Sequence, residues 1–254
     1  MLAEALLAFI AGLVIGSFST VLAHRIPRGE PWMAGRSRCP GCGATVRARD
    51  NVPVASWLWL RGRCRACGEP ISIRYPLAEL GLGALFAATV VILGTEDAGE
   101  LTLGLMLCVL LVTITLTDLD LRVIPNRLLL PGAVAGLAIA AATHLDGVPE
   151  RLIAAAAAGG FLLLVALAYP RGMGMGDVKL VAVMGLYLGR AVAPAVLIGF
   201  AAGAAVGLAL IARRGAAARK QAVPFGPFLA LGGVIGLWFG DEIVDWYLDS
   251  FFGQ

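Results

Sequence analysis

Long apolar stretches recur along the whole chain. Eight of them are predicted to be membrane-spanning helices, because a helix needs about 20 mostly apolar residues to cross the hydrocarbon core of a bilayer. They cover roughly residues 4–24, 77–95, 101–118, 127–144, 151–169, 178–189, 191–212 and 225–246. The sixth is short, and its separation from the seventh rests on Gly189 and Arg190. The pattern predicts an all-α polytopic membrane protein with about eight transmembrane helices.

The composition agrees with this interpretation. Of the 254 residues, 59% are hydrophobic and 15% are charged, whereas a soluble domain is about 45–50% apolar and about 25% charged. These values exclude a free cytosolic enzyme, a secreted disulfide scaffold and a disordered chain. The first apolar stretch has no basic segment before it and continues into a basic loop, so we expect a retained helix and not a signal peptide.

The basic residues predict which side of the membrane each loop occupies. If the loop 25–76 is cytoplasmic and the sides alternate from there, the cytoplasmic loops hold 18 of the 20 Lys and Arg residues. Only Arg151 and Arg190 fall on the other side, together with most of the acidic residues. Because basic loops resist translocation, this asymmetry predicts that both termini lie outside and that the loop 25–76 is cytoplasmic.

The loop 25–76 is the one long polar segment, and it contains two C-x2-C pairs. These pairs are Cys39 with Cys42 and Cys64 with Cys67, and a glycine follows each pair. Four thiolates with this spacing suit a tetrahedral Zn²⁺ ion. The sequence therefore predicts three parts: a first transmembrane helix (1–24), a four-cysteine zinc loop (25–76) and a seven-helix membrane-embedded core (77–250).

Two disulfides or four free thiols are the alternatives to zinc in this loop. Disulfides are rare in the cytoplasm, where the charge pattern places the loop, so we favour the metal. Four protein ligands leave no open coordination position, and we expect a structural Zn²⁺. The fifth cysteine, Cys108, lies within an apolar run and is expected to be an ordinary buried residue.

Two aspartates at the cytoplasmic ends of predicted helices are candidates for catalysis. Asp118 ends the third helix and Asp177 begins the sixth, directly after Gly174 and Gly176. Ionisable groups at the edge of a membrane span are costly and often functional. Two carboxyl groups held close together can share a proton, so that one acts as a base on water and the other as an acid.

Simpler roles are open for each acidic residue. Asp177 can cap a helix and Asp118 can be a solvated interfacial charge. We expect Asp120 to be a loop residue or an acid that supports the site without touching the substrate, and Glu79 to pair with Arg74 or to make a packing hydrogen bond. Lys179 is expected to form an ion pair or to extend toward the interface.

Several motifs occur in a defined order along the chain. They are Gly16-Ser17-Phe18 with Arg25-Ile26-Pro27, the four-cysteine loop, the segment Ser72 to Leu80, the segment Asp118 to Asn126, Gly174-Met175-Gly176-Asp177, and Pro224-Phe225-Gly226-Pro227-Phe228. Together they resemble the type IV prepilin peptidases, also called prepilin leader peptidase/N-methyltransferases, over nearly the whole chain. Thr20 departs from this pattern, since the family usually has Asn there.

The resemblance implies a bacterial cytoplasmic-membrane enzyme that removes the basic leader of type IV prepilins or pseudopilins. Asp118 and Asp177 match the family's catalytic aspartates, and Gly174, Gly176 and Lys179 are expected to support that site. N-methylation of the new terminus from S-adenosylmethionine is expected as well. The partners are then prepilin substrates and the lipid bilayer, without nucleic acid.

Two other classes of protein fit some of these features. A transporter or channel can use Asp118 and Asp177 to bind cations or protons. A membrane scaffold can present the zinc loop to a partner, with the aspartates as caps. The spans do not show the two-half repeat of many transporters, and the four-cysteine loop is unexpected in a simple transporter, so we favour the peptidase.

Overall fold

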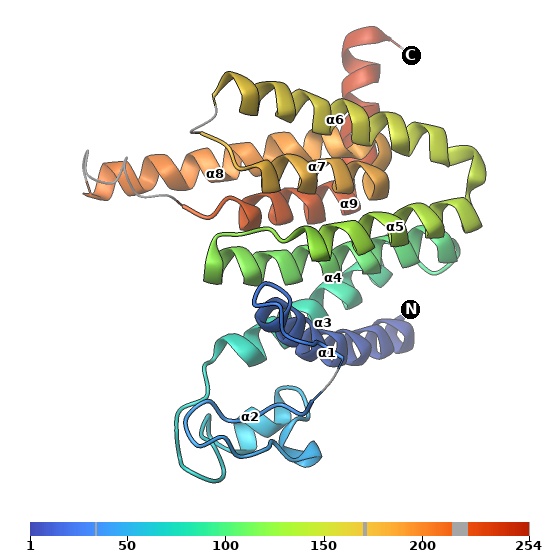
Figure 1. The fold of residues 1–254 in the computed structure, drawn as a ribbon. Helices are drawn as coiled ribbons and strands as arrows, with labels where there is room; N and C mark the ends of the chain where they lie inside the picture. Colours follow the sequence, from blue (N-terminus) through green and yellow to red (C-terminus); the bar gives the residue numbers. More distant parts are fainter. Residues whose placement is uncertain (34, 170–171, 215–222, 254) are drawn as a thin grey trace. The chain divides into compact units, whose positions relative to one another are not determined.

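The computed structural model describes all residues except 34, 170–171, 215–222 and 254 (Figure 1). The long helices are α1 (Leu2–Arg25), α3 (Arg74–Leu93), α4 (Ala98–Leu121), α5 (Asn126–Thr143), α6 (Val148–Ala168), α7 (Met175–Leu188), α8 (Val192–Arg214) and α9 (Gly226–Phe252). The short ones are α2 (Ala55–Trp59) and the 3-10 turns η1 (Ala48–Asp50), η2 (Leu145–Gly147) and η3 (Gly189–Ala191). The described residues contain isolated β-bridges but no strand, which confirms the all-α fold class.

The chain forms two compact units, Met1–Thr95 and Glu96–Gln254. In the first unit, α1 and α3 pack as an antiparallel pair through glycines. A Cβ on Gly12 would lie 2.7 Å from Gly83 Cα, and one on Gly16 would lie 2.8 Å from Glu79 Cα. Rising numbers on α1 therefore meet falling numbers on α3. Small residues at such contacts let helix backbones approach closely within lipid.

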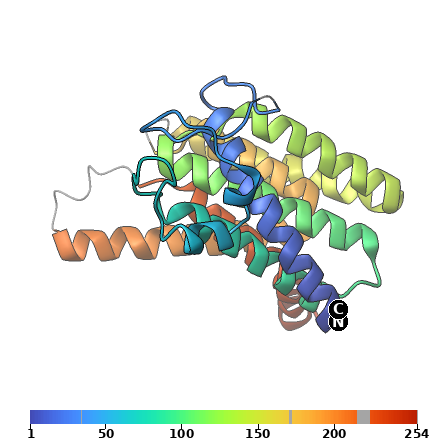
Figure 2. The same ribbon diagram turned by 90° about the horizontal axis from the view of Figure 1, so that it is seen from below.

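The second unit is a bundle of the six helices α4 to α9, with α7 near its centre. Helix α7 contacts α4, α5, α6, α8 and α9, and Figure 1 shows it between α6 and α9. The side chains of Leu111, Leu180, Met184 and Leu229, from α4, α7 and α9, are almost completely buried. In both views, the C-terminal part of α8 extends beyond the ends of its neighbours (Figures 1 and 2).

Seven helical stretches in the described residues are long and apolar enough to cross a membrane. One of them, Met175–Arg213, is 39 residues long and contains both α7 and α8. The turn η3 separates these two helices, and Gly189 in this turn has φ +54°. The predicted division at Gly189 and Arg190 is thus where the chain turns. The number of long apolar helical stretches in the described residues is seven when α7 and α8 are taken as one stretch, and eight when they are taken as two.

Helix boundaries differ from the predicted ones by a few residues in most places. The largest difference is in α9, which continues to Phe252, whereas the hydropathy pattern ended it near residue 246. The last turns contain Asp249, Phe251 and Phe252, and their mixed polarity lowers the apolar signal although the backbone stays helical.

Candidate active site and metal centre

Asp118 lies near the C-terminal end of α4 and is almost completely buried, with 6% of its surface exposed. Its Oδ2 accepts a hydrogen bond of 2.8 Å from the main-chain N–H of Gly226, the first residue of α9. The helix ends three residues after Asp118, at Leu121, and the next residue, Arg122, adopts a left-handed conformation with φ +54°. Because the Asp118 carboxylate is buried and accepts a main-chain hydrogen bond, it is not a solvated interfacial charge.

Asp177 lies in the first turn of α7 and is partly buried. The preceding glycines let the backbone approach closely. A Cβ on Gly176 would lie 2.9 Å from the Cβ of Ile124, and one on Gly174 would lie 3.1 Å from Oδ2 of Asp177 itself. Gly176 therefore lets the start of α7 lie against the α4–α5 connection, and Gly174 leaves room for the Asp177 carboxylate.

The structure brings Asp118 and Asp177 together although 59 positions separate them in the sequence. Helix α4 ends where α7 begins, the two helices are in contact, and the charges of the two carboxyl groups interact. Both lie at the same end of the second unit. The arrangement provides two acidic groups in a largely buried setting, which is the requirement for paired acid–base chemistry.

The other polar residues near this end have structural partners. Lys179 is exposed, and its Nζ donates to Oδ1 of Asn126 at 3.1 Å, which links α7 to the start of α5. Asp120 is exposed. Glu79, in the first unit, accepts a 2.7 Å hydrogen bond from the N–H of Val54, so the expected packing hydrogen bond is present.

The four cysteines of the loop form a cluster that can bind a metal ion. Their Sγ atoms all lie within 4.8 Å of one another, and those of Cys39 and Cys67 are 3.8 Å apart. A tetrahedral Zn²⁺ with bonds of about 2.3 Å requires sulfur atoms about 3.8 Å apart. A disulfide needs about 2.05 Å, and none of the four loop cysteines forms one. The donor set fits the metal and not a disulfide.

Each pair of cysteines lies in the same kind of turn. The N–H of Gly43 donates to the Cys39 carbonyl, and the N–H of Gly68 donates to the Cys64 carbonyl, both at 2.9 Å. The two glycines have φ +70° and +76°, a conformation that a side chain would strain. The main-chain N–H groups of Cys67 and Ala66 lower the pKa of the Cys64 thiol to about 7. At Cys64 the turn thus favours the thiolate, which is the form that binds a metal.

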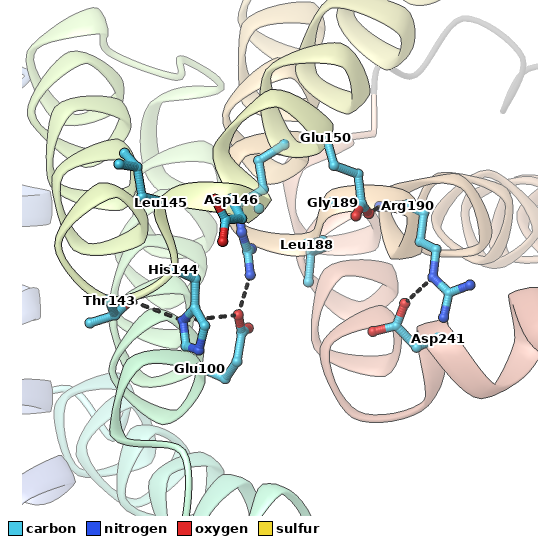
Figure 3. A pocket seen from close by; sticks show the side chains of 12 residues that line it. Glu100, Thr143, His144, Leu145, Asp146, Glu150, Leu188, Gly189, Arg190 and Asp241 are labelled. Atoms are coloured by element: carbon cyan, nitrogen blue, oxygen red, sulfur yellow. Dashed lines mark hydrogen bonds and ion pairs between the residues drawn. The ribbon is translucent and has the colours of Figure 1, made fainter.

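A second polar region lies at the opposite end of the second unit (Figure 3). It is a cavity of about 490 Å³ between the start of α4, the end of α5, the start of α6 and the turn η3. Arg151 pairs with Glu100 and also donates to the Tyr187 carbonyl, while Arg190 pairs with Asp241 and Asp245. The two arginines outside the basic loops therefore link neighbouring helices, a role that the sequence did not reveal.

Comparison with known proteins defines the class of this chain. Residues 105–208 match the model of the type IV leader peptidase family, and residues 10–93 match the bacterial Peptidase A24 N-terminal domain. The first range contains Asp118 and Asp177, and the second contains the four-cysteine cluster. The chain belongs to the type IV leader peptidase family, and the resemblance seen in its motifs is confirmed.

Curated relatives are similar over almost the full length. A protein of Aeromonas hydrophila named prepilin leader peptidase/N-methyltransferase is 38% identical over 96% of this chain and 94% of its own. A Bacillus subtilis protein of the same name is 36% identical over 96% of this chain and 98% of its own. A Burkholderia pseudomallei protein of that name is 38% identical over 92% of this chain. No solved structure matches the chain significantly.

Proposed function

We propose that this protein removes the leader peptide from type IV prepilins or pseudopilins, with Asp118 and Asp177 as its catalytic pair. The observation that carries the proposal is the meeting of these two acids at one largely buried end of the second unit, inside the segment that matches the peptidase family. The names of the curated relatives support prepilins as the substrate class.

The chemistry follows from placing two carboxyl groups side by side. Because two like charges close together repel, one group keeps a proton while the other is ionised. The ionised carboxylate takes a proton from water, which then attacks the scissile carbonyl. The protonated carboxyl donates a hydrogen bond to that carbonyl, and a proton is delivered to the leaving amine when the C–N bond breaks.

We place the active end of the bundle at the cytoplasmic face. The support is the distribution of basic residues, since the short connections at this end and the four-cysteine loop carry 18 of the 20 Lys and Arg residues. With this orientation both termini face outward. The enzyme is then a multi-pass protein of the bacterial cytoplasmic membrane.

The metal in the four-cysteine cluster is proposed to be a structural Zn²⁺. Four sulfur ligands leave no position for substrate, so Cys39, Cys42, Cys64 and Cys67 would fold the loop and take no part in bond cleavage. We also propose N-methylation of the new N-terminus, with S-adenosylmethionine as donor, on the names of the relatives.

Cleavage of a prepilin peptide by purified enzyme in detergent tests the catalytic pair. Asp118→Asn and Asp177→Asn should each lower kcat by a factor of about 10³ or more, because neither variant can exchange the required protons. Asp120→Asn is the matched control, since Asp120 is two residues from Asp118 but exposed, and it should retain near-normal cleavage. If either of the first two variants cleaves normally, the pair is wrongly assigned.

A further inference from the structure

The start of α9 carries the motif Pro224 to Phe228, which the proposed chemistry does not use. The first turn of a helix leaves main-chain N–H groups without helical partners. In α9, Pro227 has no N–H, and the N–H groups of Phe228 and Leu229 donate to the Phe225 carbonyl at 3.0 and 3.2 Å. The N–H of Gly226 is left, and it donates to Asp118 Oδ2 at 2.8 Å. The motif thus directs one main-chain donor at the carboxylate.

The contact leaves no room for a side chain at position 226. A Cβ there would lie 2.8 Å from Oδ2 of Asp118 and 3.2 Å from its Cβ and Cγ. These distances are shorter than ordinary van der Waals contact. A glycine is therefore needed for the backbone to reach the buried carboxylate of Asp118, which is 6% exposed.

Aromatic packing holds this donor in place. The ring of Phe225 lies 5.0 Å from that of Phe200 in α8 and 6.2 Å from that of Phe228, measured between centroids. A Cβ on Gly203 of α8 would lie 2.7 Å from Phe225 Cε2, so this ring fits closely against α8. Leu229, one turn into α9, is fully buried. The N–H of Gly226 belongs to a packed backbone, which fixes its direction better than a flexible side chain would.

We propose that Gly226 is a positioning residue of the peptidase site, whose main-chain N–H holds Oδ2 of Asp118 and leaves Oδ1 to face the reacting water. This inference rests on the proposed function, because it requires Asp118 to act in cleavage. Holding one carboxylate oxygen restricts the rotation of the group, and a restricted group reaches the geometry of attack without further loss of entropy. The motif at the start of α9 then belongs to the active site although its side chains do no chemistry.

An amide-to-ester replacement tests the hydrogen bond directly. Incorporating glycolic acid in place of Gly226, by cell-free translation of the full chain into lipid nanodiscs, replaces the N–H by oxygen and adds no side chain. We expect kcat for prepilin cleavage to fall about tenfold or more, because a hydrogen bond to a charged group is lost. KM should stay within about twofold, because substrate binding is not touched.

The matched control is an ester at Leu231, an exposed residue of the same helix that lies away from Asp118. It also removes a main-chain N–H from α9 and should retain wild-type kcat. A second variant changes sterics: Gly226→Ala should also lower kcat, because its Cβ would lie 2.8 Å from Oδ2 of Asp118.

Wild-type kcat in the Gly226 ester would overturn the positioning role, and so would equal losses in the two esters, since these would show a general helix defect. The Asp118→Asn variant separates this failure from that of the proposed function. If Asp118→Asn is inactive while the Gly226 ester is normal, only the positioning role is wrong. If Asp118→Asn cleaves normally, the proposed function itself fails.

Discussion

At the scale of single residues, the buried carboxylate of Glu79 stabilises an unusual main-chain turn at Val54 by a hydrogen bond. Val54 has φ +59° and ψ −52°, a conformation that is rare for a β-branched residue. The N–H of Ala55 donates to the Pro53 carbonyl across it, which makes a strained γ-turn. Glu79 is 7% exposed and accepts the N–H of Val54. The Glu79 carboxylate thus connects the strained turn of the loop to α3 by a hydrogen bond.

Replacing Glu79 should therefore loosen this turn. In Glu79→Ala the N–H of Val54 loses its buried partner, at a cost of about 1–3 kcal/mol. We expect faster amide hydrogen exchange over residues 53–59 than in the wild type, measured by mass spectrometry in detergent. Glu79→Gln keeps an acceptor oxygen and should show a smaller change.

Glu30→Ala controls for the loss of one negative charge, because Glu30 is an exposed loop residue. It should leave exchange over residues 53–59 as in the wild type. Unchanged exchange in Glu79→Ala would show that the turn does not depend on the Glu79 carboxylate.

At the scale of helices, the short helix α7 depends on the protein contacts at its two ends. Helix α7 has 14 residues and is about 21 Å long, which is shorter than the roughly 30 Å hydrocarbon core. Backbone beyond its ends must be shielded by protein, because unpaired N–H and C=O groups are costly in lipid. Its N-terminus meets the end of α4, and near its C-terminus the Tyr187 carbonyl accepts a hydrogen bond from Arg151.

The start of α4 gives a pH-dependent example. Asp97 caps this helix by accepting the N–H groups of Gly99 and Glu100, at 2.9 and 3.0 Å, and it also pairs with His144. The N–H of Glu100 and, more weakly, the charge of His144 lower the pKa of Asp97. This cap is fully present above the ordinary Asp pKa of about 3.9 and is lost as the pH falls through the lower folded-state value.

We therefore expect Asp97→Ala to lower the free energy of unfolding by roughly 1 kcal/mol near neutral pH, the usual cost of a lost N-cap. The difference from the wild type should shrink below about pH 4, as Asp97 takes up a proton. Asp97→Asn keeps a good cap and serves as the control, with a smaller loss near neutral pH. Thermal unfolding in detergent across pH measures all three, and a loss in Asp97→Ala that is constant down to pH 2 would contradict this role.

At the scale of the whole molecule, the two compact units are stabilised by different means. The second is a packed helical bundle with an apolar core. In the first, the loop between α1 and α3 has little core, and its exposed side chains include Met33, Leu58 and Trp59. The Arg65 side chain donates to both oxygens of Asp50 and lowers the pKa of that carboxyl group. We therefore expect this loop to depend on a metal bound by its four cysteines for folding energy.

Removing the metal should unfold the loop and spare the bundle. We expect one Zn²⁺ per chain by elemental analysis and its loss in Cys42→Ser. After chelation, limited proteolysis should cut within residues 36–73, while the helical circular dichroism should remain close to that of the untreated protein. Cys108→Ala is the matched control, because Cys108 lies in the bundle, and it should keep its zinc. A folded, protease-resistant loop without metal would contradict this view.

Local sequence patterns predicted much of this protein. Hydropathy depends on residue type alone, so the apolar runs located the long helices and the turn at Gly189. The two cysteine turns are also local features, because the hydrogen bonds that close each turn join residues at most five positions apart. The order of the motifs was sufficient to suggest the family that the comparisons confirm.

The contacts between distant segments were decided by the tertiary structure. Gly226 lies 108 positions from Asp118, and Val54 lies 25 positions from Glu79. The hydropathy pattern does not predict which main-chain N–H group donates to a given carboxylate, because that pairing depends on how whole helices pack. The sequence by itself determined the helices, the cysteine turns and the two aspartates as candidates. The packing of α4, α7 and α9 decided that Asp118 meets both Asp177 and the N–H of Gly226, since the close approach of these helices, permitted by their glycines, brings the three groups together.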